Sequence, residues 1–394
     1  MRKRWFLLSF GTVIALLAVS ASILLAPGNA PAPAPAAASI DEAEHAGTID
    51  AMRPPRRERP VIAIIALNAA TEITDLLVPY GVLQRANVAD VTVVAERAAS
   101  VPLHPFGLSM GPELLRIEPQ STIGAFDERY PDGADYVVVP AMLPRNDRFV
   151  VEWIAAQHRK GAKIVSVCAG SLTLAAAGLL DGRRATTHWS KLRQLQQEHP
   201  TMQWVQDRRY VADGGIITST GISASMPVMV ALVEAIAGRA KADQLAQELG
   251  ITSWDARHLS SAFQLDMQRG KAFVRNWLSF WRHETVGVPV DEGVDEIALA
   301  LTADAYSRTG LSAVVTVGSG TAVRSRYGLV VHPTTSSRAA AVDRMLPPVR
   351  RDSPALTIER ELARIAARFD RPTADIVALT MEYPWGARSA ATPR

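Results

Sequence analysis

A single cysteine, Cys168, lies where the sequence changes from a strand pattern to a helix pattern. The apolar, β-branched run that ends at Val167 predicts a buried parallel strand, and the small and apolar residues Leu172–Leu180 predict a helix that ends at Asp181-Gly182. Free N–H groups and the dipole at a helix N-terminus favour a thiolate over a thiol. The position therefore predicts a nucleophile elbow with cysteine in place of serine. Most free cysteines are small buried hydrophobes, and position alone leaves that interpretation open.

An alternation of strand and helix patterns must position this cysteine. Such an alternation predicts an α/β fold with a doubly wound parallel sheet. Ligands of these sheets bind at the carboxyl ends of the strands. The predicted strands are Val61–Leu67, Val91–Val94, Tyr136–Val139, Ile164–Val167 and Gly214–Thr220, and the predicted helices are Ile73–Ala86, Phe149–Lys160, Leu172–Leu180 and Pro227–Ala237.

Three further residues come shortly after predicted strands, which places them at the same end of the sheet as Cys168. Asp75 lies at the start of a predicted helix, Ala141 follows the strand Tyr136–Val139, and His188 lies in the loop after the elbow. Their convergence predicts a site. Taken alone, an acidic residue at a helix start is more often a cap or dipole partner, and a lone histidine is usually structural.

Four segments carry a family resemblance: Val167-Cys-Ala-Gly170, Thr186-Thr-His188, Ala212–Gly221 and Asp75–Pro79. They resemble the ThiJ/PfpI superfamily, whose members have the flavodoxin-like class I glutamine amidotransferase-like fold. The sequence of these segments is most similar to that of the PfpI-like sensor domains that are fused to AraC-type transcription regulators. The similarity covers about Arg59 to Gly250.

This resemblance implies roles for the candidate site residues. Cys168 would be the nucleophile, Asp75 would hydrogen-bond its sulfur, and the backbone N–H groups of Ala169 and Ala141 would stabilise an oxyanion. His188 belongs with them as a catalytic candidate, without an assigned step.

The sequence also departs from the family pattern at these positions. Ala169 stands where PfpI-type peptidases have histidine, and no His-x-Glu follows Gly221. Ala141 replaces a usual glycine, and alanine would be strained there if the peptide needed a positive φ. The departures weaken, without excluding, the hypothesis of catalysis.

Three functions therefore remain in view. The first is a module that binds or senses a small, electrophilic molecule over Cys168. The second is a cysteine-dependent hydratase or lyase, or a glyoxalase-like enzyme, that acts on small electrophiles. The third is a structural interaction module with an inert cysteine.

Composition narrows the classes of partner and cofactor. A hydrophobic content of 48% with 21% charged residues is that of a globular protein with a sizeable core. A net charge of +3 does not by itself indicate nucleic-acid binding. One cysteine allows no intramolecular disulfide. The scattered histidines indicate no metal site, and no cofactor is expected.

The N-terminus predicts a membrane anchor. Trp5–Ala26 is uncharged over 22 residues, which is enough to span a bilayer as a helix, and basic residues precede it. We therefore expect an anchor at 1–27, with a cytoplasmic N-terminus and an extracytoplasmic or periplasmic main domain. A cleaved signal peptide and secretion are the alternative. A Pro/Ala/Arg linker is expected at 28–59.

The rest of the chain divides into a domain at 60–250, an aromatic-rich helical connector at 251–289 and a second unit at 290–394. Phe273, Trp277 and Trp281 share one helix face, which we expect to pack against the first domain.

The last unit resembles a truncated half-copy of the first, without the site. We expect it to pack on the first domain as an intramolecular pseudo-dimer, and a homo-oligomer remains open. No helix-turn-helix pattern follows the first domain, so no nucleic-acid partner is expected. The matched segments are Glu296-Ile297 with Glu72-Ile73, Val315–Val317 with Val91–Val93, Met345–Pro347 with Met142–Pro144, and Ala374–Thr380 with Ala162–Cys168.

Overall fold

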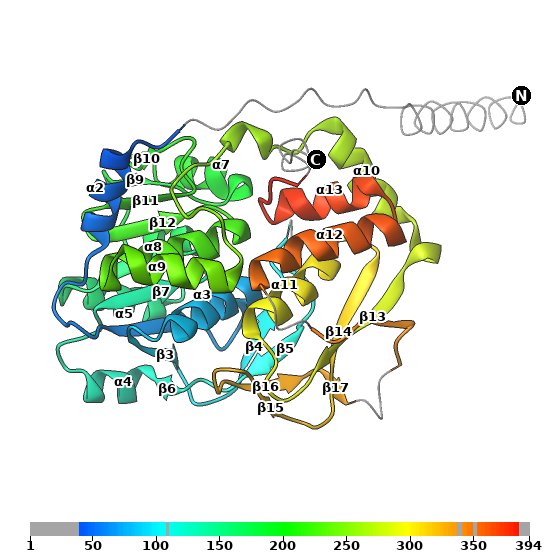
Figure 1. Ribbon diagram of the computed structural model, residues 1–394, viewed down its shortest axis with the longest axis horizontal. Coiled ribbons are helices and arrows are strands. Elements are labelled where there is room, and N and C mark those ends of the chain that lie inside the picture. The colour runs from blue at the N-terminus through cyan, green and yellow to red at the C-terminus, as the bar shows by residue number, and fades with distance from the viewer. Residues whose placement is uncertain (1–38, 108–109, 337–340, 350–352, 386–394) are drawn as a thin grey trace, which may run out of the picture.

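The computed structural model describes residues 39–107, 110–336, 341–349 and 353–385, and Figure 1 shows two α/β units side by side. The first unit is built on a seven-stranded sheet in the order β11-β12-β8-β7-β1-β3-β6. All neighbouring strands are parallel except β11 and β12. The predicted α/β fold with a doubly wound sheet is thereby confirmed for this unit. Its strands are β1 (Val61–Ala66), β3 (Asp90–Ala95), β6 (Ser121–Thr122), β7 (Tyr136–Val139), β8 (Lys163–Ser166), β11 (Tyr210–Asp213) and β12 (Ile216–Ser219).

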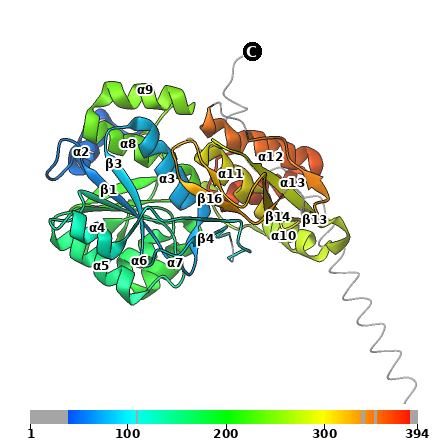
Figure 2. The same ribbon diagram turned by 90° about the horizontal axis from the view of Figure 1, so that it is seen from below.

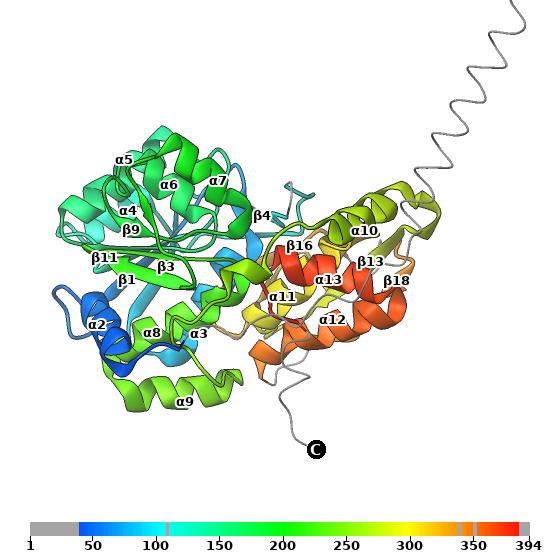
Figure 3. The ribbon, with the colours of Figure 1, turned by 90° about the horizontal axis from the view of Figure 1, so that it is seen from above.

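Helices cover both faces of this sheet, as Figure 3 shows. Alternate residues of β1 explain the two layers, because Ile62 and Ile64 join one apolar cluster while Ala63 and Ile65 join the other. One face carries α3 (Ile73–Ala86), α8 (Ser225–Ala237) and α9 (Arg239–Leu249), and the other carries α4 (Ile123–Arg129), α5 (Arg148–Arg159), α6 (Gly170–Ala176) and α7 (Trp189–Glu198).

The segment that precedes β1 is not a solvated linker. Residues 42–52 form helix α2 (Glu42–Met52), which buries Ile49 and Met52. Arg56 and Arg57 both pair with the buried Asp135. The linker expectation is therefore wrong for this part of the chain. The segment has few apolar residues in the sequence, because ion pairs and a small number of buried side chains attach it to the first unit.

The second unit contains a four-stranded parallel sheet in the order β17-β14-β13-β18. This order and these directions match those of β6-β3-β1-β7 in the first sheet. The half-copy interpretation remains a prediction, which this correspondence of strands supports. The elements are β13 (Glu284–Val290), β14 (Ser312–Gly318), β17 (Thr335–Ser336), β18 (Arg344–Met345), α10 (Met267–Leu278), α11 (Glu296–Ser307), α12 (Thr357–Arg368) and α13 (Arg371–Thr380).

One part of the proposed alignment is wrong. Ala374–Thr380, aligned above with the strand that leads to Cys168, lies in helix α13. The side chain of Asp370 caps this helix by accepting a hydrogen bond from the Thr373 N–H, and Pro372 lies in its first turn. These N-terminal signals outweigh the β-branched residues further along the segment.

A third sheet joins the two units, in the order β15-β16-β5-β4-β2. β16 pairs with β5 in antiparallel fashion, so backbone hydrogen bonds cross the junction. Beside it α11 packs on α3, and Figure 2 shows the two helices adjacent at the junction. A Cβ at Gly81 of α3 would lie 2.7 Å from Cγ1 of Ile297, so glycine permits this close approach. The strands are β2 (Thr71–Glu72), β4 (Val101–His104), β5 (Leu115–Ile117), β15 (Val323–Arg324) and β16 (Val330–Pro333).

The connector differs from its prediction. Helix α10 packs against α13 of the second unit, and Trp277 and Trp281 are exposed. The expectation that this aromatic face packs on the first domain is therefore wrong. The remaining short elements are β9 (Arg184–Ala185), β10 (Gln203–Trp204), η1 (Ile222–Ala224), η2 (Ser260–Ala262), η3 (Phe280–Arg282) and η4 (Pro354–Leu356).

The predicted anchor at 1–27 lies outside the described residues. Within the described ranges, every helix is too short or too polar to cross a bilayer.

Candidate functional site

Cys168 occupies a sharp turn between β8 and α6. Its φ is +56°, a left-handed conformation that costs a non-glycine residue about 1–2 kcal/mol. The Cys168 N–H donates to the Thr220 carbonyl oxygen at 3.1 Å, and the Ser171 hydroxyl donates to the Cys168 carbonyl oxygen at 3.2 Å. Helix α6 approaches β7 so closely that a Cβ at Gly170 would collide with the Val139 carbonyl oxygen. The local backbone therefore has the strained strand–turn–helix form of an elbow.

Beneath the elbow lie two buried carboxylates of α3. The Ala141 N–H donates to Oδ2 of Asp75 at 3.1 Å, and Oδ1 of Asp75 has no hydrogen-bond partner among the described residues. Glu72 caps α3, because its Oε2 accepts from the Asp75 N–H at 2.6 Å and from the Thr74 hydroxyl at 2.7 Å. Glu72 was not singled out as a site residue from the sequence, although its position three residues before Asp75 is a capping signal.

An arginine from the second unit neutralises this acidic pair. Nη2 of Arg308 lies 3.2 Å from Oε1 of Glu72, and its Nε lies 2.8 Å from Oδ1 of Asp304. Its Nη1 donates to the Thr380 carbonyl oxygen at 3.1 Å. All three charged side chains are buried. No motif near Arg308 identifies it as a residue of the site, because its partner Glu72 is more than two hundred residues away in the sequence.

Burial keeps protons on these groups. Desolvation, followed by repulsion from Asp304, raises the pKa of Glu72 to about 7. Desolvation, followed by the charge of Glu72, raises the pKa of Asp75 well above its ordinary value. At neutral pH the two carboxyls therefore compete for protons instead of both being ionised.

The thiol shows the same effect. Burial raises the pKa of Cys168 well above its ordinary value, and the charges of Asp75, Glu72 and Glu382 raise it further. Hydrogen bonding by the Ala169 N–H opposes this rise. The expectation that the helix N-terminus favours a thiolate is therefore wrong. Helix α6 has only seven residues and ends at Ala176, short of the predicted Leu180, and buried carboxylates surround the sulfur.

His188 has a structural role in this arrangement. Its Nδ1 accepts from the Ser190 N–H at 3.2 Å and thereby caps α7, and its Nε2 lies 3.2 Å from the Thr380 carbonyl oxygen. These partners assign the proton to Nε2. Burial lowers the pKa of His188, which keeps the ring neutral. Both ring nitrogens are occupied, so the ring is not poised to take a proton from Cys168.

The second unit supplies one more charge to the site. Oε2 of Glu382 accepts the Gly221 N–H, and its Oε1 lies 3.5 Å from Nε2 of His258. Glu382 has a φ of +53°, and its side chain is buried. It therefore contacts the backbone at Gly221, the residue after which the sequence lacks a His-x-Glu motif. Its distance along the chain explains why sequence reasoning missed it.

A pocket of about 110 Å³ opens over Cys168. Asp75 is not among its lining residues, although its charge acts on the Cys168 thiol. The Ala141 N–H is occupied by Asp75, and Ala141 has no positive φ, so the predicted strain is absent. Of the predicted site residues, the structure brings four into the pocket wall: Ala141, Cys168, Ala169 and His188.

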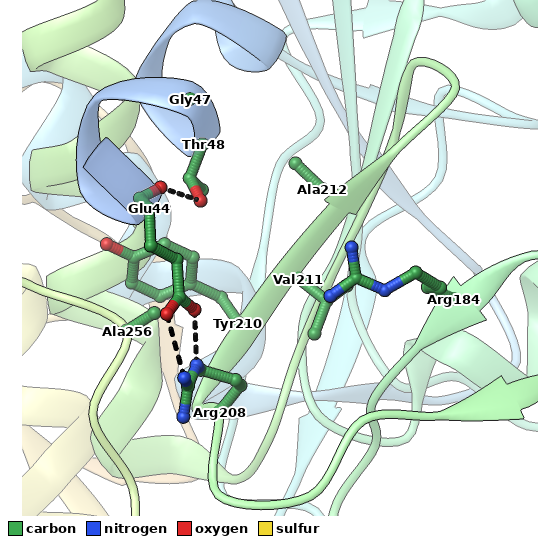
Figure 4. Close-up of a pocket in the computed structure, with 9 residues that line it drawn as sticks. All are labelled: Glu44, Gly47, Thr48, Arg184, Arg208, Tyr210, Val211, Ala212 and Ala256. Carbon is green, nitrogen blue, oxygen red and sulfur yellow. Dashed lines mark hydrogen bonds and ion pairs between the residues drawn. The ribbon is translucent and has the colours of Figure 1, made fainter. Parts of the chain in front are cut away.

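Figure 4 shows a second pocket, of about 210 Å³, between α2 and β11. Oε1 and Oε2 of Glu44 lie 2.5 and 2.8 Å from the guanidinium of Arg208, so the charge of that arginine is already satisfied. None of the predicted site residues lines this pocket.

Comparison with known proteins gives the family of the first unit. Residues 61–235 match the model of the DJ-1/PfpI family. The HTH-type transcriptional regulator CdhR of Pseudomonas aeruginosa is 36% identical over 99 residues, which are 25% of this chain and 29% of that protein. The isonitrile hydratase of Pseudomonas putida is 38% identical over 93 residues, which are 23% of this chain and 39% of that protein. The chain thus matches well under half the length of either relative.

Solved structures show a more distant similarity. The crystal structure of Drosophila melanogaster DJ-1beta aligns with a TM-score of 0.42 at 22% identity, covering 49% of this chain and 99% of that one. The resemblance read from the sequence motifs is confirmed by the family match and by the regulators among the relatives. Residues 61–235 of this chain form a DJ-1/PfpI family domain.

Proposed function

We propose that the chain binds a small, electrophilic molecule in the pocket over Cys168 and acts as a sensor for it. The observation that carries this proposal is the pocket itself, which is about 110 Å³ in volume and contains the only cysteine of the chain. A cavity of about 150 Å³ accepts benzene, so this one suits a ligand of roughly four to six non-hydrogen atoms.

Three features favour binding over turnover. The Cys168 thiol has a raised pKa, the Ala141 N–H is held by Asp75, and His188 uses both ring nitrogens elsewhere. A neutral thiol in an apolar pocket resists general alkylation and still offers a soft contact to a bound ligand. The relatives that are transcriptional regulators are consistent with a sensing role.

A second candidate is a cysteine-dependent hydratase or lyase, or a glyoxalase-like enzyme. The Oδ1 of Asp75, which has no hydrogen-bond partner among the described residues, favours it. In the fraction of molecules whose Asp75 is ionised, this oxygen could take the thiol proton as Sγ bonds to the carbon of an isonitrile and could return the proton to that carbon; water could then displace Sγ, giving a formamide and the free thiol. The isonitrile hydratase among the relatives supports chemistry of this class. An inert cysteine in an interaction module is the third candidate, and chemical reactivity separates it from the other two.

We also propose that Trp5–Ala26 anchors the chain in a membrane, with the main domain extracytoplasmic and no nucleic-acid partner. The uncharged length of this segment and the basic residues before it support the anchor, and secretion after cleavage is the alternative. The packing of α11 on α3 supports an intramolecular pseudo-dimer, while a homo-oligomer stays open.

The test is the pH dependence of Cys168 alkylation by iodoacetamide, followed by mass spectrometry. We expect a midpoint above the value of about 8.5 that is usual for an exposed thiol, and we expect Asp75→Asn to move the midpoint to lower pH by removing a negative charge. At pH 9.5, small isocyanides and α-oxoaldehydes should slow labelling by occupying the pocket.

Two variants serve as controls for this experiment. Cys168→Ser should abolish labelling, and Leu172→Phe should fill the pocket and remove the protection. A midpoint below about 8.5 with measurable consumption of either electrophile would favour the enzyme instead. Labelling that no electrophile slows would leave only the inert module.

A further inference from the structure

The connector carries an exposed apolar surface that the pocket does not explain. Trp277 is 69% exposed, Phe280 is 75% exposed and Trp281 is 72% exposed. Clusters of large apolar side chains of this kind mark interaction surfaces in soluble domains. We call the set the tryptophan surface, and it comprises Met267, Val274, Trp277, Leu278, Phe280 and Trp281.

The helix that carries this surface is held firmly from behind. Asn276 is fully buried, and its amide donates to the Thr309 carbonyl oxygen at 2.9 Å and to the Thr373 hydroxyl at 3.0 Å. Ala272 is buried on the same side. The apolar residues of α10 therefore face outward because the helix is docked in one orientation, with its polar Asn276 inside and Trp277 outside. Phe280 and Trp281 follow in η3 and are exposed as well.

We propose that the tryptophan surface rests in the headgroup region of a lipid bilayer. Tryptophan favours this region, because its ring is apolar and its indole N–H still needs a polar partner. Twelve residues of α10 extend for about 18 Å, against a hydrocarbon core of about 30 Å. The helix is therefore too short to cross a bilayer and suited to lie along its surface.

Charge near the surface is positive but partly compensated. From residue 263 to 283 the chain has four cationic residues, and Asp266 is the only acidic one. Nη2 of Arg275 and Nη2 of Arg282 lie 2.9 and 3.4 Å from Oδ2 of Asp370 on the neighbouring α13. We therefore expect apolar contact to dominate, with anionic lipid adding a smaller attraction.

The proposed anchor would hold the chain near a bilayer. In Figure 1 the first described residues, in blue, lie at the upper left of the molecule and α10 lies at its upper right. Residues 27–38 can reach across at most about 43 Å when extended. This inference rests on the proposed anchor, which would keep the whole chain, and with it the tryptophan surface, close to a bilayer.

The experiment uses the full chain in lipid vesicles with one environment-sensitive probe. In a Cys168→Ser background, Val274→Cys places a nitrobenzoxadiazole probe on the tryptophan surface. Phe149→Cys places the same probe on α5 of the first domain, at a residue of matching exposure, 48% against 45%. We expect brominated lipid to quench the probe at 274 at least two-fold and to leave the probe at 149 unchanged.

Flotation of the vesicles separates this inference from the anchor. Protein that floats with the vesicles and has a quenched probe at residue 274 supports the inference. The double variant Trp277→Ser, Trp281→Ser should then show less quenching and the same flotation. Chain that floats with an unquenched probe at 274 overturns the inference and leaves the anchor standing. Chain that does not float overturns both. A probe at 274 that shifts with protein concentration in lipid-free detergent identifies a second copy as the occupant and also overturns the inference.

Discussion

The two units share a strand order but diverge after the fourth strand. In the first unit β7 leads through α5 to β8 and Cys168, whereas in the second β18 leads through α12 to helix α13. Thr380, which aligns with Cys168 in the sequence, lies at the end of α13, and its carbonyl oxygen accepts from Arg308. The second unit therefore has no elbow at this position.

The second unit instead closes the first site. Arg308 pairs with Glu72, and Glu382 holds the Gly221 N–H beside Cys168. Similar strand order thus serves two purposes: one unit holds the cysteine, and the other sets the charge around it. This comparison can be tested by changes on either side of the junction.

The largest effect is expected for Arg308→Met. The variant leaves Glu72 and Asp304 buried without their cation, and removing one partner of a buried ion pair costs about 3–5 kcal/mol. We expect that loss in the unfolding free energy from guanidinium titration. Arg148→Met serves as a control at an exposed ion pair and should leave the transition unchanged. An unchanged transition for Arg308→Met would show that the two units are not coupled through this cluster.

The next effect is a pH dependence of stability from Glu72. Its pKa is about 7 in the folded chain and about 4.5 when exposed, so the folded state binds more protons between these values. The stability it contributes is complete below pH 4.5 and is lost as pH rises through 7. The unfolding free energy should therefore fall by roughly 3 kcal/mol from pH 4.5 to 8.

The variant Glu72→Gln isolates this contribution. His188, whose pKa is lowered, acts in the opposite direction, because its contribution is lost as pH falls below about 6.5. The difference between the chain and Glu72→Gln at each pH removes the histidine contribution. A difference that does not change with pH would mean that folding leaves the pKa of Glu72 unchanged.

A smaller effect is expected at the joining sheet. The Thr316 hydroxyl donates to the Leu114 carbonyl oxygen at 2.6 Å and accepts from the Thr334 N–H at 2.9 Å. Thr316→Val keeps the shape and leaves the buried Leu114 carbonyl oxygen unpaired, which costs about 1–3 kcal/mol. Thermal unfolding followed by calorimetry should show a lower midpoint for this variant. Thr316→Ser, which keeps the hydroxyl, should lose less.

The smallest effect is expected for Ala141→Gly, which restores the residue usual in the family. Ala141 has no positive φ, so glycine adds freedom to the unfolded chain and should cost about 0.4–1 kcal/mol. The Cys168 alkylation rate should stay the same, because the N–H remains bonded to Asp75. A faster reaction in this variant would show that the peptide at 141 turns towards the pocket.

Local patterns in the sequence predict the first unit well. Helix Ile73–Ala86 and strand Tyr136–Val139 have the predicted bounds, because β-branched runs and caps specify them within a few residues. The pocket wall around Cys168 follows from those elements. The family match confirms the resemblance that the motifs indicate.

Local patterns in the sequence do not predict the charged residues around the Cys168 thiol. Arg308, Asp304 and Glu382 come from the second unit, and only tertiary packing brings them to Cys168. The predicted thiolate was wrong for the same reason, since a local helix dipole is weaker than burial among carboxyls. Helix α13 was missed because an N-cap and a proline decided the conformation of a β-branched segment.

The continuous β16–β5 pairing has a consequence for stoichiometry. When a site is completed by a separate subunit, dilution empties it, and each assembly carries two equivalent sites. Here both units belong to one polypeptide, so the effective concentration of Arg308 and Glu382 at the site does not depend on how much protein is present. Each chain has a single cysteine, so a ligand that binds over Cys168 would occupy one such site per chain.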